Sequence, residues 1–81
     1  MGMLRVLSRR GDDRYEWNTS QVETGDKEAE AAVREAERVF REERARGSTA
    51  LRLRPGQAPE KINEFDPHAE EIVLVPRVIG G

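Results

Sequence analysis

The chain has 81 residues, of which 37% are charged, with a formal net charge of −2 and no cysteine. A domain of this size buries only about 60% of the surface that its unfolded chain exposes, so an interior catalytic cleft is hard to build. The lack of cysteine excludes a disulfide framework, a thiolate metal site and a cysteine nucleophile. The balanced charge argues against a dedicated nucleic-acid binder, which usually carries a basic excess. We therefore expect one soluble, cytoplasmic domain.

The first residues carry no pattern for secretion or membrane insertion. No long apolar stretch follows residues 1–5, so the sequence predicts neither a signal peptide nor a membrane span. A second methionine, Met3, follows Met1-Gly2. A native start at Met3, with two residues added before it, is therefore as compatible with the sequence as a start at Met1.

Two short runs near the N-terminus alternate apolar and polar residues, at residues 3–10 and 14–18. A period of two residues is typical of strands with one buried face. The Gly-Asp-Asp sequence at residues 11–13 is typical of a turn. The pattern predicts a β-hairpin with its turn at these three residues. The side chains that we expect in its core or at the core rim are Leu4, Val6, Tyr15 and Trp17.

Residues 26–46 carry the pattern of one amphipathic helix, with small and apolar residues in a narrow stripe. Asp26 or Thr24 is suited to cap its N-terminus, and Gly47 is the usual left-handed terminator. The remaining faces carry Glu and Arg four residues apart, in the order that stabilises an exposed helix surface. The expected stripe is Ala29, Ala32, Val33, Ala36 and Phe40, and the expected ion pairs are Glu30–Arg34, Glu37–Arg41 and Glu42–Arg46.

Residues 49–54 alternate strictly and end at a Pro-Gly pair, which predicts a strand with one buried face. We expect its two leucines on the buried face and its two arginines on the other. The arginines of this strand and of the first strand would then share the sheet face away from the helix. These residues are Arg5, Arg9, Arg52 and Arg54.

Residues 57–68 are polar, with Ile62 and Phe65 as anchors to the core, and a short strand or one helical turn can lie within them. Residues 71–75 are apolar at four consecutive positions after Glu71, which is typical of a strand buried on both faces. We therefore expect this last strand inside the sheet, beside the first strand.

The order of elements is hairpin, helix, strand, irregular segment and strand. It predicts an α+β domain of the β-grasp type, with a mixed four- or five-stranded sheet packed on one long helix. A ferredoxin-like split unit is the rival plan, but it needs two helices of similar rank. The predicted core is Leu4, Val6, Val33, Ala36, Phe40, Leu51, Leu53, Ile72 and Leu74.

Residues 71–81 resemble the C-terminus of ubiquitin-like proteins, with an apolar last strand, a short tail and a terminal Gly80-Gly81. They are also similar to bacterial sulfur carriers, notably the small subunit of molybdopterin synthase. Those carriers place an acidic residue before the strand, a proline after it and an apolar pair before the diglycine. The resemblance implies a ubiquitin-like β-grasp domain over residues 1–76 and a flexible diglycine tail over residues 77–81.

In the families that this C-terminus resembles, a partner enzyme adenylates the terminal carboxylate, which then passes to an amine, a thiol or sulfide. The resemblance thus implies activation at Gly81. Two glycines suit this chemistry because a backbone without Cβ can enter a narrow channel. Residues 76–81 can reach about 20 Å at about 3.3 Å per residue. The implied site residues are Gly80 and Gly81 for activation, and Arg77, Val78 and Ile79 for partner binding.

We expect a protein modifier that is joined to amines of target proteins and is not itself an enzyme. The alternatives are a sulfur carrier with a C-terminal thiocarboxylate and a non-conjugated module that docks through the basic sheet face of Arg5, Arg52 and Arg54. The expected partner is a ubiquitin-activating-type adenylating enzyme that uses ATP. For a modifier, a conjugating enzyme and a deconjugating peptidase can act as well. No cofactor, metal, nucleic acid or membrane is expected to bind.

Some features have a simpler structural explanation. The arginine-bearing face can equally be a solvated surface whose arginines pair with Glu16 and its neighbours. RNA binding there is not favoured because the arginines lack aromatic stacking platforms. His68 stands in a polar segment without a second ligand or a nucleophile, so neither a metal site nor general-base catalysis is expected. The only lysines, Lys27 and Lys61, would offer few sites for self-conjugation.

Overall fold

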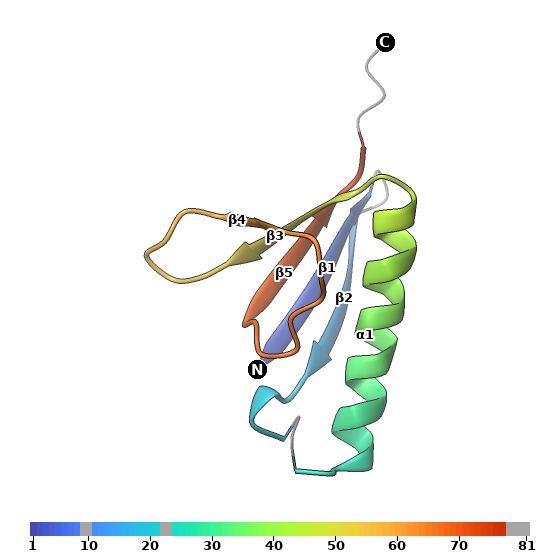
Figure 1. Cartoon of the computed structure of the whole chain (residues 1–81), viewed down its shortest axis with the longest axis vertical. Helices are drawn as coiled ribbons and strands as arrows, with labels where there is room; N and C mark the ends of the chain where they lie inside the picture. The colour runs from blue at the N-terminus through green and yellow to red at the C-terminus, as the bar shows by residue number, and fades with distance from the viewer. Residues whose placement is uncertain (9–10, 22–23, 78–81) are drawn as a thin grey trace.

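The structure, a computed structural model, describes residues 1–8, 11–21 and 24–77. It is a small α+β domain in which one helix packs on one face of a mixed five-stranded sheet (Figure 1). The strands follow the order β2-β1-β5-β3-β4 across the sheet. The elements are β1 (Gly2–Ser8), β2 (Gly11–Trp17), the 3-10 turn η1 (Thr19–Gln21), α1 (Lys27–Ala45), β3 (Thr49–Leu53), β4 (Glu60–Ile62) and β5 (Glu71–Val75).

β5 lies at the centre of the sheet. It pairs in parallel with β1, where Leu4 lies opposite Ile72, and antiparallel with β3. Its three middle residues, 72–74, are all buried. The prediction that the last strand lies inside the sheet beside the first is confirmed, since an apolar run of this kind needs cover on both faces.

α1 begins and ends where the sequence predicts. The Asp26 side chain caps the first turn by accepting the backbone N–H of Glu28 at 3.0 Å. At the other end Gly47 adopts the left-handed conformation, with φ of 97°. The Gly47 N–H donates to the Arg44 carbonyl and the Ser48 N–H to the Glu43 carbonyl, both at 3.0 Å. This pair of bonds satisfies carbonyls that a helix end otherwise leaves free.

Charged pairs cover the exposed faces of α1. Two of the three predicted pairs form, but the third is wrong because Glu42 contacts Arg38 instead of Arg46. Such exposed pairs each stabilise a helix by only about 0.2–0.5 kcal/mol, so a change of partner has little energetic consequence. The pairs in the structure are Glu30–Arg34, Glu35–Arg38, Glu37–Arg41, Arg38–Glu42 and Glu43–Arg46.

The core fills the space between α1 and one face of the sheet. Trp17 is 2% exposed, and its Nε1 donates to the Pro67 carbonyl at 2.7 Å. The Phe65 ring lies 5.3 Å from Trp17 and 5.8 Å from Phe40, so it joins strand and helix as the predicted anchor. Leu4, Val6, Ala36, Phe40, Ile72 and Leu74 are buried as predicted, whereas Tyr15, Val33, Leu51, Leu53 and Ile62 are half-buried.

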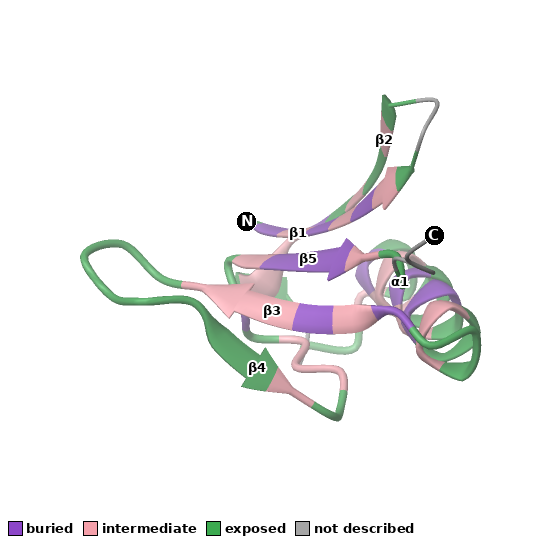
Figure 2. Cartoon of the chain, turned by 90° about the horizontal axis from the view of Figure 1, so that it is seen from above, coloured by how far each residue is buried: buried purple, intermediate pink, exposed green. Residues whose placement is uncertain are grey.

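The predicted orientation of β3 is wrong. Ala50 is fully buried opposite Leu74, while Leu51 and Leu53 are half-buried on the other face. Figure 2 shows a buried band within β3 between half-buried stretches. Ala50 lies in the same core cluster as Phe40. Since Ala50 is fully buried in a closely packed core, a leucine there would overfill the space.

The predicted position of the hairpin turn is also wrong. β2 already begins at Gly11, which pairs with Ser8, so residues 11–13 belong to the strand, and residues 9–10 lie outside the described residues. Asp12 lies in the strand, where Arg5 and Arg14 donate hydrogen bonds to its carboxylate. Of the two possibilities left open within residues 57–68, a short strand or one helical turn, the structure has the short strand, β4. In the described ranges, no helix is long and apolar enough to cross a membrane.

Candidate functional site

The chain leaves the sheet at the end of β5. Val75 is the last strand residue, and the exposed Pro76 and Arg77 follow it. The exit lies at the end of the sheet where α1 also ends (Figure 1). The four residues on which the sequence places activation and part of the partner contact lie outside the described residues. They are Val78, Ile79, Gly80 and Gly81.

Arg77 lies against the end of the helix. A Cβ placed on Gly47 would come within 3.2 Å of Cδ and 3.7 Å of Cβ of Arg77, so the Arg77 side chain lies over the bare Gly47 backbone. A cation is favourable beside a helix C-terminus, where the backbone carbonyls carry partial negative charge. Arg44 holds the same turn in place by donating to the Ser48 carbonyl at 2.9 Å and to Asn63 Oδ1 at 3.2 Å.

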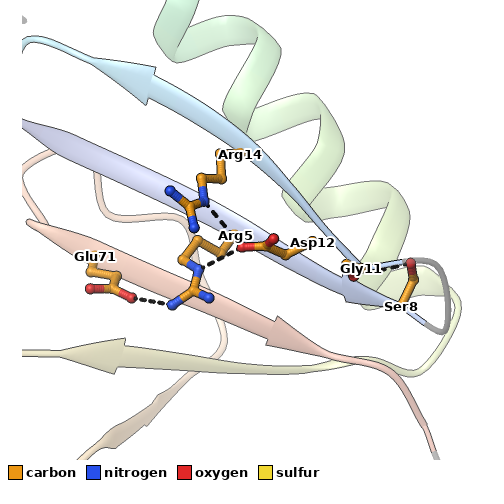
Figure 3. A network of polar contacts seen from close by, with 6 residues as sticks. All are labelled: Arg5, Ser8, Gly11, Asp12, Arg14 and Glu71. Atoms are coloured by element: carbon orange, nitrogen blue, oxygen red, sulfur yellow. Dashed lines mark hydrogen bonds and ion pairs between the residues drawn. The ribbon is translucent and has the colours of Figure 1, made fainter.

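Arg5 lies at the centre of a polar network on the sheet face away from α1 (Figure 3). Its Nε donates to Asp12 at 3.1 Å, and its Nη1 donates to Glu71 at 3.3 Å. Arg14 Nε also donates to Asp12 at 3.1 Å. The hydrogen bonds from Arg14 and Arg5 lower the pKa of the Asp12 carboxyl. Two arginines and two carboxylates neutralise one another, so this network adds no net positive charge to the face.

Arg52 lies on the opposite face of the sheet, because β3 places it in register with the buried Ile72. Its Nη1 donates to Asp66 at 2.7 Å and its Nη2 donates to Glu60. These bonds, to Glu60 first and then to Asp66, raise the pKa of Arg52. Burial by itself raises the pKa of Asp66, but hydrogen bonds from the His68 backbone N–H and from Arg52 outweigh it and lower that pKa.

The expectation of one shared arginine face is therefore wrong. Arg5 and Arg52 lie on opposite faces, Arg54 is exposed beyond the end of β3, and Arg9 lies outside the described residues. The expected pairing with Glu16 is replaced in the structure by the bonds from Arg5 to Asp12 and Glu71. The cause is the orientation of β3, since turning its leucines outward turns Arg52 inward.

Sequence reasoning missed the apolar character of the outer sheet face, the face away from α1. The register puts Leu51 beside Val73, and Val73 beside Arg5. The alternation of residues 49–54 could not reveal this, because both of its faces contain an apolar side chain. The first strand did indicate it, since Met3 and Leu7 are apolar and alternate with the predicted core residues, which places them on the outer face. The apolar residues of the outer sheet face are Met3, Leu7, Leu51, Leu53, Val73 and Val75.

The remaining candidates offer little chemistry. Within residues 1–8, 11–21 and 24–77, no three His, Asp or Glu side chains lie close enough together to hold a metal ion. His68 is exposed. A hollow of ≈ 480 Å³ beside Phe65 is lined by Arg52 and Asp66, which bind each other. A carboxylate held by an arginine in this way keeps its charge and is a poor proton donor near neutral pH.

No family model, characterised protein or solved structure matches the chain. The ubiquitin-like resemblance of residues 71–81 therefore stays a prediction. It is supported by the sequence of that segment and by the α+β architecture into which its strand folds.

Proposed function

We propose that the chain is a ubiquitin-like protein modifier with a β-grasp fold. A partner enzyme adenylates the Gly81 carboxylate, which is then joined to amines of target proteins. The strand order β2-β1-β5-β3-β4 and the single helix across one sheet face are consistent with this fold. The diglycine after the last strand supplies the reacting group.

The observation that carries the proposal is the central position of β5. This strand is hydrogen-bonded to β1 on one side and to β3 on the other, and its middle residues are buried. A partner that draws the tail into its active site pulls on the strand before it. An edge strand would have only one neighbour to resist that pull, whereas β5 has two. The reacting end is therefore attached to the strand that opens least readily.

Two residues after β5 suit presentation of the tail. Pro76 lacks a backbone N–H and cannot extend the pairing with a neighbouring strand, so the sheet ends at Val75. Arg77 is exposed and can pair with carboxylates of the activating enzyme. Both residues therefore suit a chain that leaves the sheet toward a partner.

The proposed chemistry proceeds in two balanced steps. In the first, a Gly81 carboxylate oxygen attacks the α-phosphorus of ATP bound by the partner, and pyrophosphate leaves. In the second, a neutral lysine amine attacks the acyl carbon, AMP leaves with the electron pair of the broken bond, and the nitrogen loses a proton. A thiol of the partner can carry the acyl group between these steps. The product is an isopeptide bond; relative to the two free proteins it lacks the elements of one water, because a carboxylate oxygen leaves on AMP and the amine loses a proton.

The two alternatives differ from the modifier in the fate of the Gly81 carboxylate. A sulfur carrier shares the first step, but sulfide then displaces AMP and leaves a thiocarboxylate at Gly81. A non-conjugated module needs no reaction at Gly81 and would depend on its surface alone. The separation of Arg5 from Arg52 removes the shared arginine face from that module, which would instead use the apolar outer sheet face.

The test uses the purified chain with ATP and an extract of its native host, followed by intact-mass measurement. The proposal predicts an adenylate or a thioester at Gly81 and, after longer incubation, products joined to other proteins with loss of one water. A chain without Gly81 is the matched control and should give none of these. Full recovery of the unmodified chain from active extract, with ATP still present, would contradict the proposal.

A further inference from the structure

The contact between Gly47 and Arg77 joins two parts of the chain that are distant in sequence. Gly47 ends α1, and Arg77 follows the last strand. Any side chain at Gly47 would approach the Arg77 Cδ to 3.2 Å, which is tighter than an ordinary van der Waals contact. The aliphatic part of Arg77 therefore lies against the space that a Cβ at Gly47 would fill, and it would have to shift by a few tenths of an ångström to admit one.

Gly47 differs in this respect from three other glycines with positive φ, Gly11, Gly25 and Gly56. Among the described residues, a Cβ added at any of those three would meet no atom within 4 Å. Their conformation alone explains why glycine stands there, because L side chains rarely adopt positive φ. At Gly47 a second requirement is added, since the position must also stay clear for Arg77.

We propose that Gly47 is a positioning residue for activation of the C-terminus. By leaving room for Arg77 against the helix end, it fixes the point at which the tail leaves the domain and the direction in which Arg77 presents its charge. The partner that receives the tail then docks on the exposed Arg46 and Gly47 together with Arg77. This inference rests on the function proposed above.

The structure supports this role on two counts. The turn is itself rigid, because Arg44 binds the Ser48 carbonyl and the Ser48 N–H returns to the Glu43 carbonyl. Arg77 also gains from its place there, since a cation beside a helix C-terminus is stabilised by the aligned backbone dipoles. A rigid surface and a held arginine reduce the freedom that the partner would otherwise have to remove on binding.

The test compares Gly47→Ala with Gly56→Ala. Both variants place alanine at positive φ, so both should lose stability, but only Gly47→Ala displaces Arg77. With the adenylating enzyme and ATP, Gly47→Ala should raise the KM for the chain by about two- to fivefold, the range expected for loss of one charge interaction at a helix end. The kcat should not change. Gly56→Ala, normalised to its folded fraction, should keep the KM of the unaltered chain.

A double variant separates positioning from a purely structural effect. If Gly47 acts through Arg77, then Gly47→Ala should have no further effect on KM in an Arg77→Ala background. Arg77→Lys keeps the aliphatic stem and the charge, so it should retain most of the activation that Arg77→Ala loses. Equal KM values for Gly47→Ala and Gly56→Ala, or additive effects of Gly47→Ala and Arg77→Ala, would overturn the inference.

A measurement without the partner checks the contact itself. Proton NMR should give a nuclear Overhauser effect between the Gly47 Hα and Arg77 Hδ protons, and its absence would overturn the inference. Failure of the proposed function gives a different result, because no variant, nor the unaltered chain, would then be activated. Failure of the inference alone leaves the chain active and Gly47→Ala with an unchanged KM.

Discussion

The indole ring of Trp17 lies directly across the backbone of Gly2, so that a Cβ at Gly2 would come within 2.6 Å of Trp17 Cζ2. The two residues are partners in the pairing of β1 with β2. The ring cannot move away freely, since its Nε1 donates to the Pro67 carbonyl at 2.7 Å. Gly2 is therefore part of the folded strand, and the sequence alone had not assigned it a structural role.

The first prediction rests on this contact. Gly2→Ala should lower the free energy of unfolding by about 1–3 kcal/mol, because the added methyl group overpacks the site. Urea denaturation followed by tryptophan fluorescence measures the change. In a Trp17→Phe background, followed by circular dichroism, the smaller ring leaves more space, so the same substitution should be less destabilising there. An equal loss of unfolding free energy in both backgrounds would show that the Trp17 ring does not limit the space at Gly2.

The second prediction tests the orientation of β3. Ala50 is fully buried, whereas Leu51 is half-buried on the outer sheet face. Ala50→Leu should lower the free energy of unfolding by about 1–3 kcal/mol through overpacking. Leu51→Thr should lower it by less than about 1 kcal/mol, the span of strand propensity at a surface position. Chemical denaturation measures both losses of stability. A larger loss for Leu51→Thr than for Ala50→Leu would show instead that the leucines face the core.

The third prediction concerns acid stability. The pKa of Asp66 is lowered in the folded state, so its carboxylate stabilises the fold above its unfolded pKa, and that contribution is lost as pH falls through the folded pKa. Asp66→Asn should therefore be destabilising at pH 7, and the difference from the unaltered chain should shrink below about pH 4. Thermal unfolding across this range measures the change.

The control for this pH dependence is Arg52→Gln, which removes one of the two hydrogen bonds that lower the Asp66 pKa. In that background Asp66→Asn should have a smaller effect at pH 7. A difference between Asp66→Asn and the unaltered chain that stays constant from pH 7 to about pH 3 would show that the carboxylate charge contributes nothing.

The sequence could predict those parts of the fold whose pattern of residues lies within one continuous segment. The α1 boundaries follow from the Asp26 cap, the apolar stripe and Gly47, all within one segment. The central place of β5 follows from its unbroken apolar run. The face of β3 could not be predicted, because Ala50 and Leu51 are both apolar. The choice between them depends on which side chain packs into the core cluster under α1, which is a tertiary property.

The candidate site likewise has features that the sequence shows and features that only the structure shows. The diglycine and the residues before it are visible in the sequence, whereas the contact of Gly47 with Arg77 joins segments that are far apart in sequence. The prediction of a shared arginine face was wrong because it depended on the orientation assumed for β3. Arg52 was predicted on the outer sheet face, whereas in the structure it lies on the other face and donates to Glu60 and Asp66.

The proposed modifier role requires that Gly81 be joined to other proteins. Mass spectrometry of the chain, tagged at its N-terminus, tests this after recovery from its native host under denaturing conditions. We expect peptides in which Gly81 forms an isopeptide bond with lysines of other proteins, and none when Gly81 is deleted. A population that carries only a C-terminal thiocarboxylate, or only a free carboxylate, would contradict it.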